Sequence, residues 1–276
     1  MQRTLAGALG VDGAGLVSFV GAGGKTTGLQ RLAVELAVAT SGVIVTTTTA
    51  MFARELASHG PLVLCDDDPA TAHERCGEAL RHSGTVALAG HLAPEGKVKG
   101  LAPAAVDDLW SQRLAGSIVV EADGSRGLPL KAFGRHEPQL PPASTTVVVV
   151  AGLDALGRPL DAAHVHRAEL LAPTLPAAMG ADVTPELLAT VVALQVERVR
   201  DLVPRARVVV LLNKTDADGL AQAPKRAAAG ERAAAGEEAA ARLLEPAGQA
   251  RSHGSAAPER VVIGSLWRGV YRVVRA

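Results

Sequence analysis

A short glycine-rich segment contains the residue types that bind phosphate. It consists of Gly21, Ala22, Gly23, Gly24, Lys25, Thr26 and Thr27. Glycines let the backbone approach an anion closely, while backbone N–H groups and a lysine ammonium neutralise phosphate charge. A hydroxyl directly after the lysine is the group that ligates Mg²⁺ in such loops. The segment therefore predicts a phosphate-binding loop, with Lys25 on the phosphates and Thr26 on the metal.

The spacing of this loop departs from the common pattern. Counting G-x-x-x-x-G-K-[ST] back from Lys25 places the first glycine at Phe19. Either Gly21 opens a loop two residues shorter than usual, or fewer amides reach the phosphates. A glycine-rich turn with a surface lysine is the alternative without a ligand. The flanking residues favour phosphate binding, because 16–20 have strand character and 29–38 have helical spacing of Leu and Ala.

Two acids near the end of another apolar run form the second candidate site. Glu121 and Asp123 follow the strand-like residues 117–120, and their spacing of two places them on one face. In phosphate-loop proteins, an acid at the end of a neighbouring strand holds the Mg²⁺ shell, usually through water. We therefore expect Asp123, with Glu121 beside it, to join Thr26 at a metal. A strand ending in Asp-Gly is also an ordinary turn signal.

Cations are dense in the loop after these acids. Residues 125–137 include Arg126, Lys131, Arg135 and His136 among glycines and prolines. A cationic loop that starts at a metal ligand is a candidate switch or substrate loop. His136 could serve there as a general acid or base, although a lone loop histidine is more often structural or exposed.

Hydroxyl and imidazole groups supply weaker candidates. Thr48 belongs to four threonines that follow the strand-like residues 43–45, at the edge where open α/β sheets bind ligands. Threonine is also common in strands for steric reasons. His164 and His166 would project alike from an extended segment. Because no third ligand is evident, we treat them as substrate-site candidates and not as a metal site.

A guanine-recognition pattern follows the apolar residues 208–212. Asn213, Lys214 and Asp216 form an N-K-x-D sequence. A carboxylate accepts hydrogen bonds from N1–H and the 2-amino group of guanine, which adenine does not offer, while the lysine stem packs over the base. Four residues can match by chance, but this match stands at a strand end downstream of a phosphate loop. It predicts that GTP or GDP binds better than ATP or ADP.

The elements that must position these residues alternate between strand-like and helical segments. Apolar residues make up 48% of the chain but aromatic residues only 2%, so Val, Leu and Ala must build the core. Such a composition suits a buried parallel sheet under helices. We expect an α/β fold of the P-loop NTPase type, with a mostly parallel sheet, helices on both faces and nucleotide at the carboxyl edge.

The expected domain organisation is a single domain over residues 1–276. Residues 61–115 are a candidate insertion or smaller lobe, and 217–258 are expected to be exposed, helical and partly flexible. We expect a loop at 91–100 and a closing helix at 266–274.

Charge and cysteine content restrict the partners. Lys+Arg and Asp+Glu both total 28, so no global field favours nucleic acid or a membrane surface. Cys65 and Cys76 lack the spacing of a zinc site or a disulfide framework. Without a clear signal peptide or a membrane-length apolar stretch, the expected location is the cytoplasm. The sequence leaves the oligomeric state open.

Taken together, the motifs resemble the selenium-dependent molybdenum hydroxylase accessory proteins of the YqeC type. The similar segments are 20–27, 45–49, 120–131, 136–138, 165–167 and 212–216. The loop at 21–27 has the form found in that family, which accounts for Phe19, whereas the Ala-rich stretch after Asp216 has no counterpart. The resemblance implies a nucleotide-dependent role in maturing molybdenum hydroxylases that carry selenium. Its implied partners are the molybdenum cofactor or a hydroxylase client.

Three functions remain open from the sequence. The first is an NTP-hydrolysing accessory protein, in which Lys25 and Asp123 act with Mg²⁺ on GTP or ATP. The second is a small-molecule kinase or other phosphoryl transferase, in which the loop residues Arg126, Lys131 and His136 hold the acceptor. The third is a nucleotide-binding module without turnover. They differ in what receives the γ-phosphate, and no residue that would orient an attacking water can be identified.

Overall fold

The computed structural model describes residues 4–65, 69–175, 179–216, 229–245 and 257–274. Much of the segment expected to be helical and flexible, at 217–228 and 246–256, lies outside the described residues. Among the described residues, no helix combines the length and the apolar character needed to cross a membrane.

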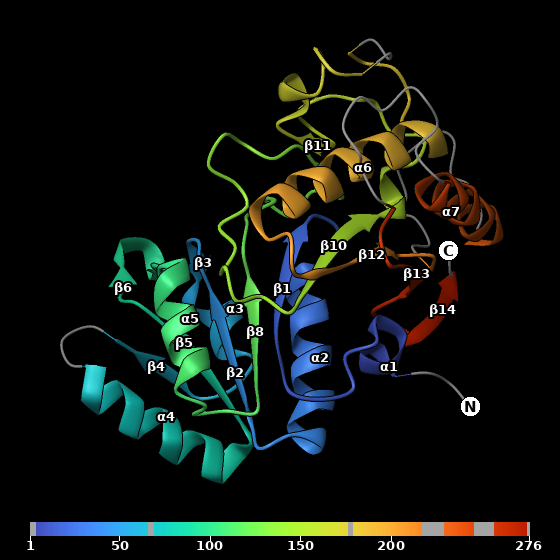
Figure 1. Cartoon of the computed structure of the whole chain (residues 1–276). Helices are drawn as coiled ribbons and strands as arrows, with labels where there is room; N and C mark the ends of the chain where they lie inside the picture. Colours follow the sequence, from blue (N-terminus) through green and yellow to red (C-terminus); the bar gives the residue numbers. More distant parts are fainter. Residues whose placement is uncertain (1–3, 66–68, 176–178, 217–228, 246–256, 275–276) are drawn as a thin grey trace.

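A nine-stranded sheet forms the centre of the molecule (Figure 1). Within the described part of the chain, every neighbouring pair in it is parallel except the last two strands along the chain, which are antiparallel. In spatial order the strands are β14 (Val270–Val274), β13 (Arg260–Ser265), β12 (Arg207–Asn213), β10 (Thr146–Gly152), β1 (Gly15–Gly21), β8 (Ser117–Glu121), β2 (Val43–Thr47), β5 (Thr85–Ala89) and β4 (Leu62–Leu64).

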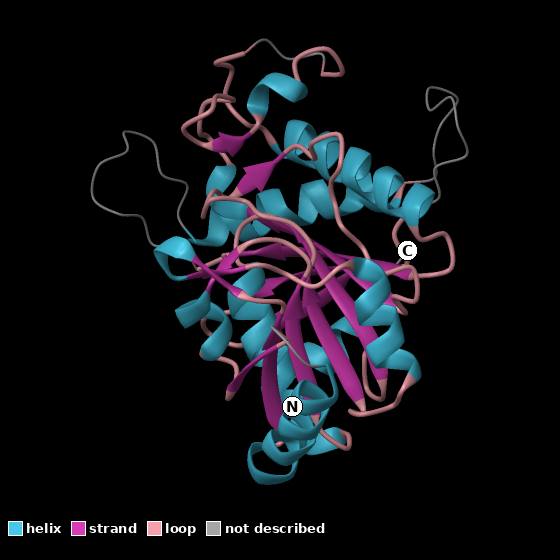
Figure 2. Ribbon diagram, turned by 90° about the vertical axis from the view of Figure 1, so that its left-hand side faces the viewer, coloured by secondary structure: helices cyan, strands magenta, loops and turns pink. Residues whose placement is uncertain are grey.

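Helices cover both faces of this sheet, and Figure 2 shows its strands running side by side between them. One face packs on α1 (Leu5–Leu9), α2 (Lys25–Ala39) and α3 (Ala53–Ala57). The other packs on α4 (Pro69–Ser83), α5 (Pro103–Ser111), α6 (Pro185–Leu202) and α7 (Ala229–Leu244). Because both faces are covered, β1, β8 and β10 are buried along their whole length and read as continuous apolar runs. The predicted α/β architecture is confirmed.

Two small sheets flank the main one. The first pairs β9 (Leu130–Lys131) with β11 (Val165–His166) in parallel. The second joins β3 (Met51–Phe52), β7 (Lys97–Val98) and β6 (Leu92–Ala93) in antiparallel pairs. Three single 3₁₀ turns complete the described elements: η1 (Pro94–Gly96), η2 (Leu153–Ala155) and η3 (Ala168–Leu170).

The first of two corrections to the sequence predictions concerns residues 91–100, which were expected to be a loop. They contain the β6–β7 hairpin. In its turn, the φ angles of Glu95 and Gly96 are 69° and 70°. The two strands have two residues each, which is too short to give a strand pattern in this polar, glycine-flanked sequence.

The second correction concerns residues 266–274, where a helix is wrong. They form a tight turn and the edge strand β14, in which Val270 pairs with Ser265. Gly269 makes the turn at φ 69°, and β-branched valines then favour the extended chain.

The regions at 61–115 and 229–245 both pack on the central sheet. Strands β4 and β5 extend it directly, and α4 and α5 add side chains to one core cluster. Helix α7 packs its Ala239, Ala240 and Leu243 into the same cluster. This helix is therefore amphipathic rather than exposed all round.

Candidate functional site

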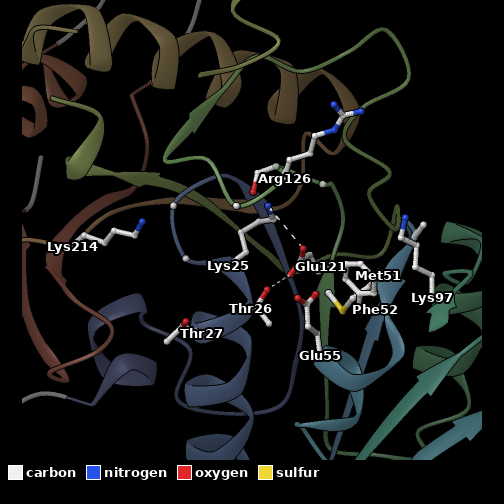
Figure 3. A pocket seen from close by; sticks show the side chains of 16 residues that line it. Lys25, Thr26, Thr27, Met51, Phe52, Glu55, Lys97, Glu121, Arg126 and Lys214 are labelled. Atoms are coloured by element: carbon white, nitrogen blue, oxygen red, sulfur yellow. Dashed lines mark hydrogen bonds and ion pairs between the residues drawn. The ribbon is translucent and has the colours of Figure 1, made fainter. Parts of the chain in front are cut away.

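A cavity of about 510 Å³ lies beside the N-terminal end of α2 (Figure 3). Its volume is within the usual range for small-molecule sites, about 300–1,000 Å³. The lining residues come from the phosphate-loop candidate, the segment after β2, the end of β8, the following loop and the end of β12. They are Gly23, Gly24, Lys25, Thr26, Thr27, Ala50, Met51, Phe52, Glu55, Lys97, Glu121, Gly124, Ser125, Arg126, Gly127 and Lys214.

The floor of this cavity is the start of a 15-residue helix without a side-chain cap. Gly24 occupies the N-cap position, and the N–H of Gly28 is the first to reach its carbonyl, at 3.0 Å. The first-turn N–H groups of Lys25, Thr26 and Thr27 therefore have no i−4 carbonyl within the helix. Together with the helix dipole, they form an anion-binding end.

The loop before this helix uses its own N–H groups elsewhere. Gly21 N donates to Asp123 Oδ2 at 3.0 Å, Ala22 N to Val150 O at 2.8 Å, and Gly23 N to Leu128 O at 3.1 Å. A Cβ on Gly21 would lie 2.3 Å from Val150 O, so only glycine fits against β10. Of the two alternatives raised by the spacing, this geometry favours the one with fewer amides available to phosphate.

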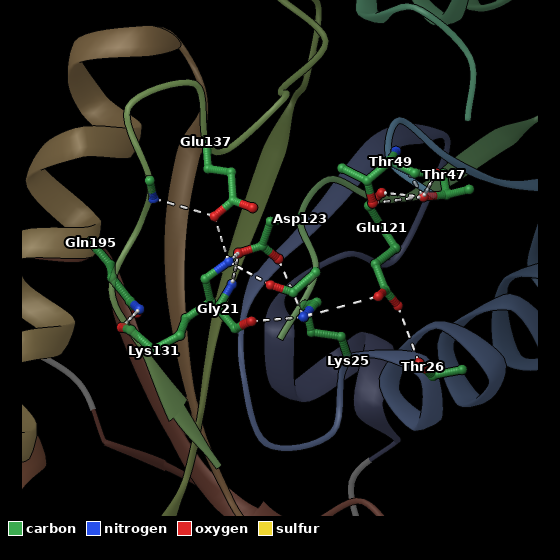
Figure 4. A network of polar contacts seen from close by, with 12 residues as sticks. Gly21, Lys25, Thr26, Thr47, Thr49, Glu121, Asp123, Lys131, Glu137 and Gln195 are labelled. Carbon is green, nitrogen blue, oxygen red and sulfur yellow. Dashed lines mark hydrogen bonds and ion pairs between the residues drawn. The ribbon is translucent and has the colours of Figure 1, made fainter. Parts of the chain in front are cut away.

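The ammonium group of Lys25 lies between this loop and two acids (Figure 4). Its Nζ donates to Gly21 O at 2.7 Å, forms an ion pair with Asp123 Oδ1 at 3.2 Å, and lies 4.0 Å from Glu121 Oε1. The side chain is only 3% exposed although it lines the cavity. A buried cation is therefore fixed at the end of α2.

Asp123 is surrounded by cations on both sides. It is fully buried, and its Oδ2 accepts from Gly21 N at 3.0 Å and lies 2.9 Å from Lys131 Nζ. It does not line the cavity, whereas Glu121 does. Thr26 Oγ1 donates to Glu121 Oε2 at 3.2 Å. Of the three predicted metal residues, the structure thus brings together Thr26 and Glu121 at the cavity and places Asp123 behind them.

The chemistry of Glu121 suits a divalent cation. Burial raises the pKa of its carboxyl to about 7, Lys25 opposes this shift, and the charge of Asp123 adds to it. A cation bound at the site would favour the ionised form. Among the described residues, no group of three or more His, Cys, Asp or Glu could hold a metal. Thr26 and Glu121 are the cavity residues that could hold a Mg²⁺ ion, which commonly takes one or two protein ligands and completes its shell with water and phosphate oxygens.

The network continues away from the cavity through Lys131 (Figure 4). Its fully buried Nζ donates to Gly124 O at 2.6 Å and to Glu137 Oε2 at 2.7 Å, and Arg167 also pairs with Glu137. Burial alone would raise the pKa of Glu137, but Lys131, the Gly134 N–H and Arg167 hold it below its ordinary value. Lys131, predicted as a substrate or switch residue, thus lies between the carboxylates of Asp123 and Glu137, which also pair with Lys25 and Arg167.

The remaining candidates of the cationic loop separate in space. Arg126 lines the cavity. Its backbone φ angle is 51°, in the left-handed region. His136 is exposed and is not among the lining residues. Thr48 likewise lies outside the lining, and its hydroxyl donates to Gln139 O at 2.7 Å.

The two histidine candidates of the segment after β10, His164 and His166, have different surroundings. His164 Nδ1 lies 2.8 Å from Asp161 Oδ1. His166 is in β11 beside Lys131, and burial, with the charges of Lys131 and Arg167, lowers its pKa.

The N-K-x-D residues reach the loop from β12. Asn213 Nδ2 donates to Gly23 O at 2.8 Å, and its Oδ1 accepts from Leu266 N at 2.9 Å. Lys214 lines the cavity and its Nζ lies 2.7 Å from Asp154 Oδ2. Asp216 pairs with Arg268 at 3.3 Å and is not a lining residue. Asn213 therefore braces the phosphate-loop candidate, while Asp216 lies farther out.

One wall of the cavity was missed by sequence reasoning. It consists of Met51, Phe52, Glu55 and Lys97. The Nζ atom of Lys97 lies 5.3 Å from the centroid of the Phe52 ring. These residues come from β3, α3 and β7, which the β3–β7 pairing brings together. The sequence signal of Met51, Phe52 and Glu55 was a position after β2, at the ligand-binding edge. Lys97 follows β5 in the segment 91–100, which was expected at the same edge.

Comparison with known proteins identifies the family. The model of the family described as "YqeC protein" matches residues 17–169. A protein of Escherichia coli (strain K12) described as "Uncharacterized protein YqeC" is 40% identical over 152 residues, which are 55% of this chain and 57% of that protein. The match thus spans little more than half of that relative. A solved apo structure of a GTPase from Pyrococcus abyssi covers 92% of both chains, at 13% identity and a TM-score of 0.35, which is too low to support an argument. Because the family model matches more than half of the chain, the protein belongs to the YqeC family.

Proposed function

We propose that this protein binds a nucleoside triphosphate with Mg²⁺ in the 510 Å³ cavity and hydrolyses it during maturation of selenium-dependent molybdenum hydroxylases. The observation that carries the proposal is the uncapped N-terminus of α2, which opens into this cavity with the buried Lys25 at its first position. Membership of the YqeC family supports the nucleotide-binding part. The maturation role, with the molybdenum cofactor or a hydroxylase client as partner, rests on the sequence resemblance.

In this proposal, the chain supplies charge and orientation to the phosphates. The first-turn N–H groups of α2 donate to phosphate oxygens, and Lys25 adds a charge-assisted contact. Thr26 and Glu121 hold Mg²⁺, which when bound would neutralise phosphate charge. Asp123 and Lys131 do not touch the nucleotide. They fix Lys25 and the start of the loop from behind.

A preference for GTP over ATP belongs to the same proposal. Asn213 is already bonded to the phosphate-loop candidate, and Lys214 lines the cavity, so the segment after β12 is close to where a nucleotide would extend. Guanine would reach Asp216 by competing with Arg268 for its carboxylate.

The cavity wall formed by Met51, Phe52, Glu55 and Lys97 favours a second candidate function, phosphoryl transfer to a small molecule. Glu55 provides a carboxylate there, Lys97 a cation, and Phe52 an apolar surface. An acceptor hydroxyl or acid bound at this wall would face the terminal phosphate, with Arg126 beside it. These groups would serve a phosphoryl acceptor as well as they would serve water.

Product analysis with γ-labelled GTP and ATP tests these alternatives. Each nucleotide is incubated with the protein and Mg²⁺, with and without a small-molecule cell extract. Label in free phosphate supports hydrolysis, and label on a metabolite supports the transferase. Nucleotide that binds but is recovered unchanged would indicate a nucleotide-binding module without turnover. If neither nucleotide binds, the proposal is wrong.

A further inference from the structure

A second cavity, of about 520 Å³, lies between α6, η3 and the loop after β9. Its lining residues are Lys131, Ala132, Phe133, Gly134, Arg135, Leu170, Leu171, Thr174, Val191, Leu194, Gln195 and Arg198. The two cavities share no lining residue. The fully buried Lys131 separates them, because it lines the second cavity while its Nζ pairs with Asp123 behind the first.

The charge of this cavity is positive. Arg135 and Arg198 both line it, and no acid does. Among the described residues, neither guanidinium forms an ion pair with a carboxylate. Arg198 Nη2 lies 3.4 Å from Arg135 O, which keeps the two arginines adjacent. The third cation, Lys131, is already neutralised by Asp123 and Glu137. Two guanidinium groups at a concave surface suit an anion such as phosphate or carboxylate.

The walls of the cavity are mostly apolar and include a buried amide. Phe133 and four aliphatic side chains line it, namely Leu170, Leu171, Val191 and Leu194. Gln195 is only 3% exposed, and its Nε2 donates to Lys131 O at 2.7 Å. Its Oε1 is buried and has no hydrogen-bond partner within the described part of the chain. Buried acceptors are rarely left unpaired, so an N–H donor on a ligand would satisfy this oxygen.

We propose that this cavity is a second ligand site, for a small molecule that joins an anionic group to an apolar ring. The arginines bind the anion, the ring packs against Phe133 and the leucines, and Gln195 accepts a hydrogen bond from a ring N–H where the ligand has one. Its volume matches that of the nucleotide-site candidate, so a compound of similar size fits. The proposal does not rest on the proposed nucleotide chemistry, since the two cavities share no lining residue.

Calorimetric titration with aromatic probes tests the site. The probes are 1-naphthyl phosphate, 1-naphthoate and the neutral 1-naphthol. Both anions are expected to bind at least about 10-fold more tightly than the alcohol, because only they engage the guanidinium groups. The relative affinity of the phosphate and the carboxylate then tells which anion the arginines prefer.

Variants assign the bound probe to this cavity. Arg135→Ala combined with Arg198→Ala is expected to weaken binding of the anions at least about 10-fold. Arg81→Ala, a matched control at an exposed arginine of α4, is expected to leave it unchanged. Leu194→Trp fills the cavity from α6 and is expected to block all three probes, with a retained melting transition to show that the variant is folded.

Three results would overturn the proposal. In the first, neither anion binds. In the second, the anions bind no better than 1-naphthol. In the third, Lys25→Ala loses its affinity for the anions, whereas the double arginine variant keeps it. The last result would place the probe in the first cavity. None of these results would refute nucleotide binding in the first cavity, so failure here is distinguishable from failure of the proposed function.

Discussion

The ends of β8 and β12 use similar residue types in different ways. Each places polar and charged groups directly after a buried strand, at the same edge of the sheet. After β8, Asp123 is fully buried and contacts two buried lysines. After β12, the side chains of Lys214 and Asp216 are 33% and 17% exposed. Lys214 pairs there with Asp154, and Asp216 pairs with Arg268.

The difference shows that burial, more than residue type, decides the role of a strand-end acid. Removing a buried carboxylate that lies between two lysines lowers the free energy of unfolding strongly, because both ammonium groups then stay buried without a counter-charge. A partly exposed pair exchanges with solvent at little cost. The β8 end is therefore suited to holding a fixed charge arrangement, and the β12 end to contacting an incoming ligand.

The largest expected effect is on stability at the β8 end. Asp123→Ala leaves Lys25 and Lys131 without their shared carboxylate and is expected to lower the free energy of unfolding by about 3 kcal/mol. Asp154→Ala removes the matched, one-third exposed partner of Lys214 and should cost less than about 1 kcal/mol. Urea denaturation of both variants measures the difference. Equal losses would remove the contrast between the two strand ends.

A smaller effect is expected at the one buried residue of the β12 end. Asn213→Ala breaks the hydrogen bonds to Gly23 O and Leu266 N and should destabilise the fold by about 2 kcal/mol, because both backbone groups are buried. Lys214→Ala, at the next position, serves as the control and should change stability by less than about 1 kcal/mol. The same denaturation experiment applies. A loss in Asn213→Ala no greater than in the control would show that the brace contributes nothing.

The smallest effect is on base preference. Asp216→Ala is expected to reduce the affinity for GTP about 10-fold and to leave that for ATP unchanged, because only guanine offers the two N–H donors that a carboxylate accepts. Calorimetry with both nucleotides in the presence of Mg²⁺ gives the ratio. A wild-type protein without base preference, or an equal loss for both nucleotides, would assign Asp216 to structure alone.

The central strands could be predicted from the sequence because each is a largely apolar run between turn signals, and in β2, β8 and β10 most of the residues are β-branched. The strands outside the centre of the sheet were harder to predict. Within the described part of the chain, residues 270–274 pair only with β13, and residues 92–98 contain two strands of two residues each, so neither region carries a long pattern. In both regions the turns at Gly269 and Gly96 decide the structure.

The site was predictable where its residues stand at the carboxyl end of a central strand or at the start of the helix that follows one. Lys25 and Thr26 open α2, and Glu121 ends β8, so their meeting follows from a strand, loop and helix order. The burial of Lys131 was not predictable, because it depends on Asp123 and Glu137 enclosing one ammonium from different directions. The wall with Glu55 and Lys97 depends on the β3–β7 pairing, which has no local signal.

The most direct test of the account is calorimetric titration of Lys25→Met with Mg·GTP and Mg·ATP. Lys99→Met is the matched control, because Lys99 is exposed and does not line the cavity. Circular dichroism melting verifies that both variants are folded. Lys25 supplies a charge-assisted contact at the first position of α2, beside the first-turn N–H groups. The account therefore predicts a loss of affinity of about 100-fold in Lys25→Met and none in the control. Unchanged affinity in a folded Lys25→Met protein would contradict the assignment of α2 and its lysine as the phosphate site.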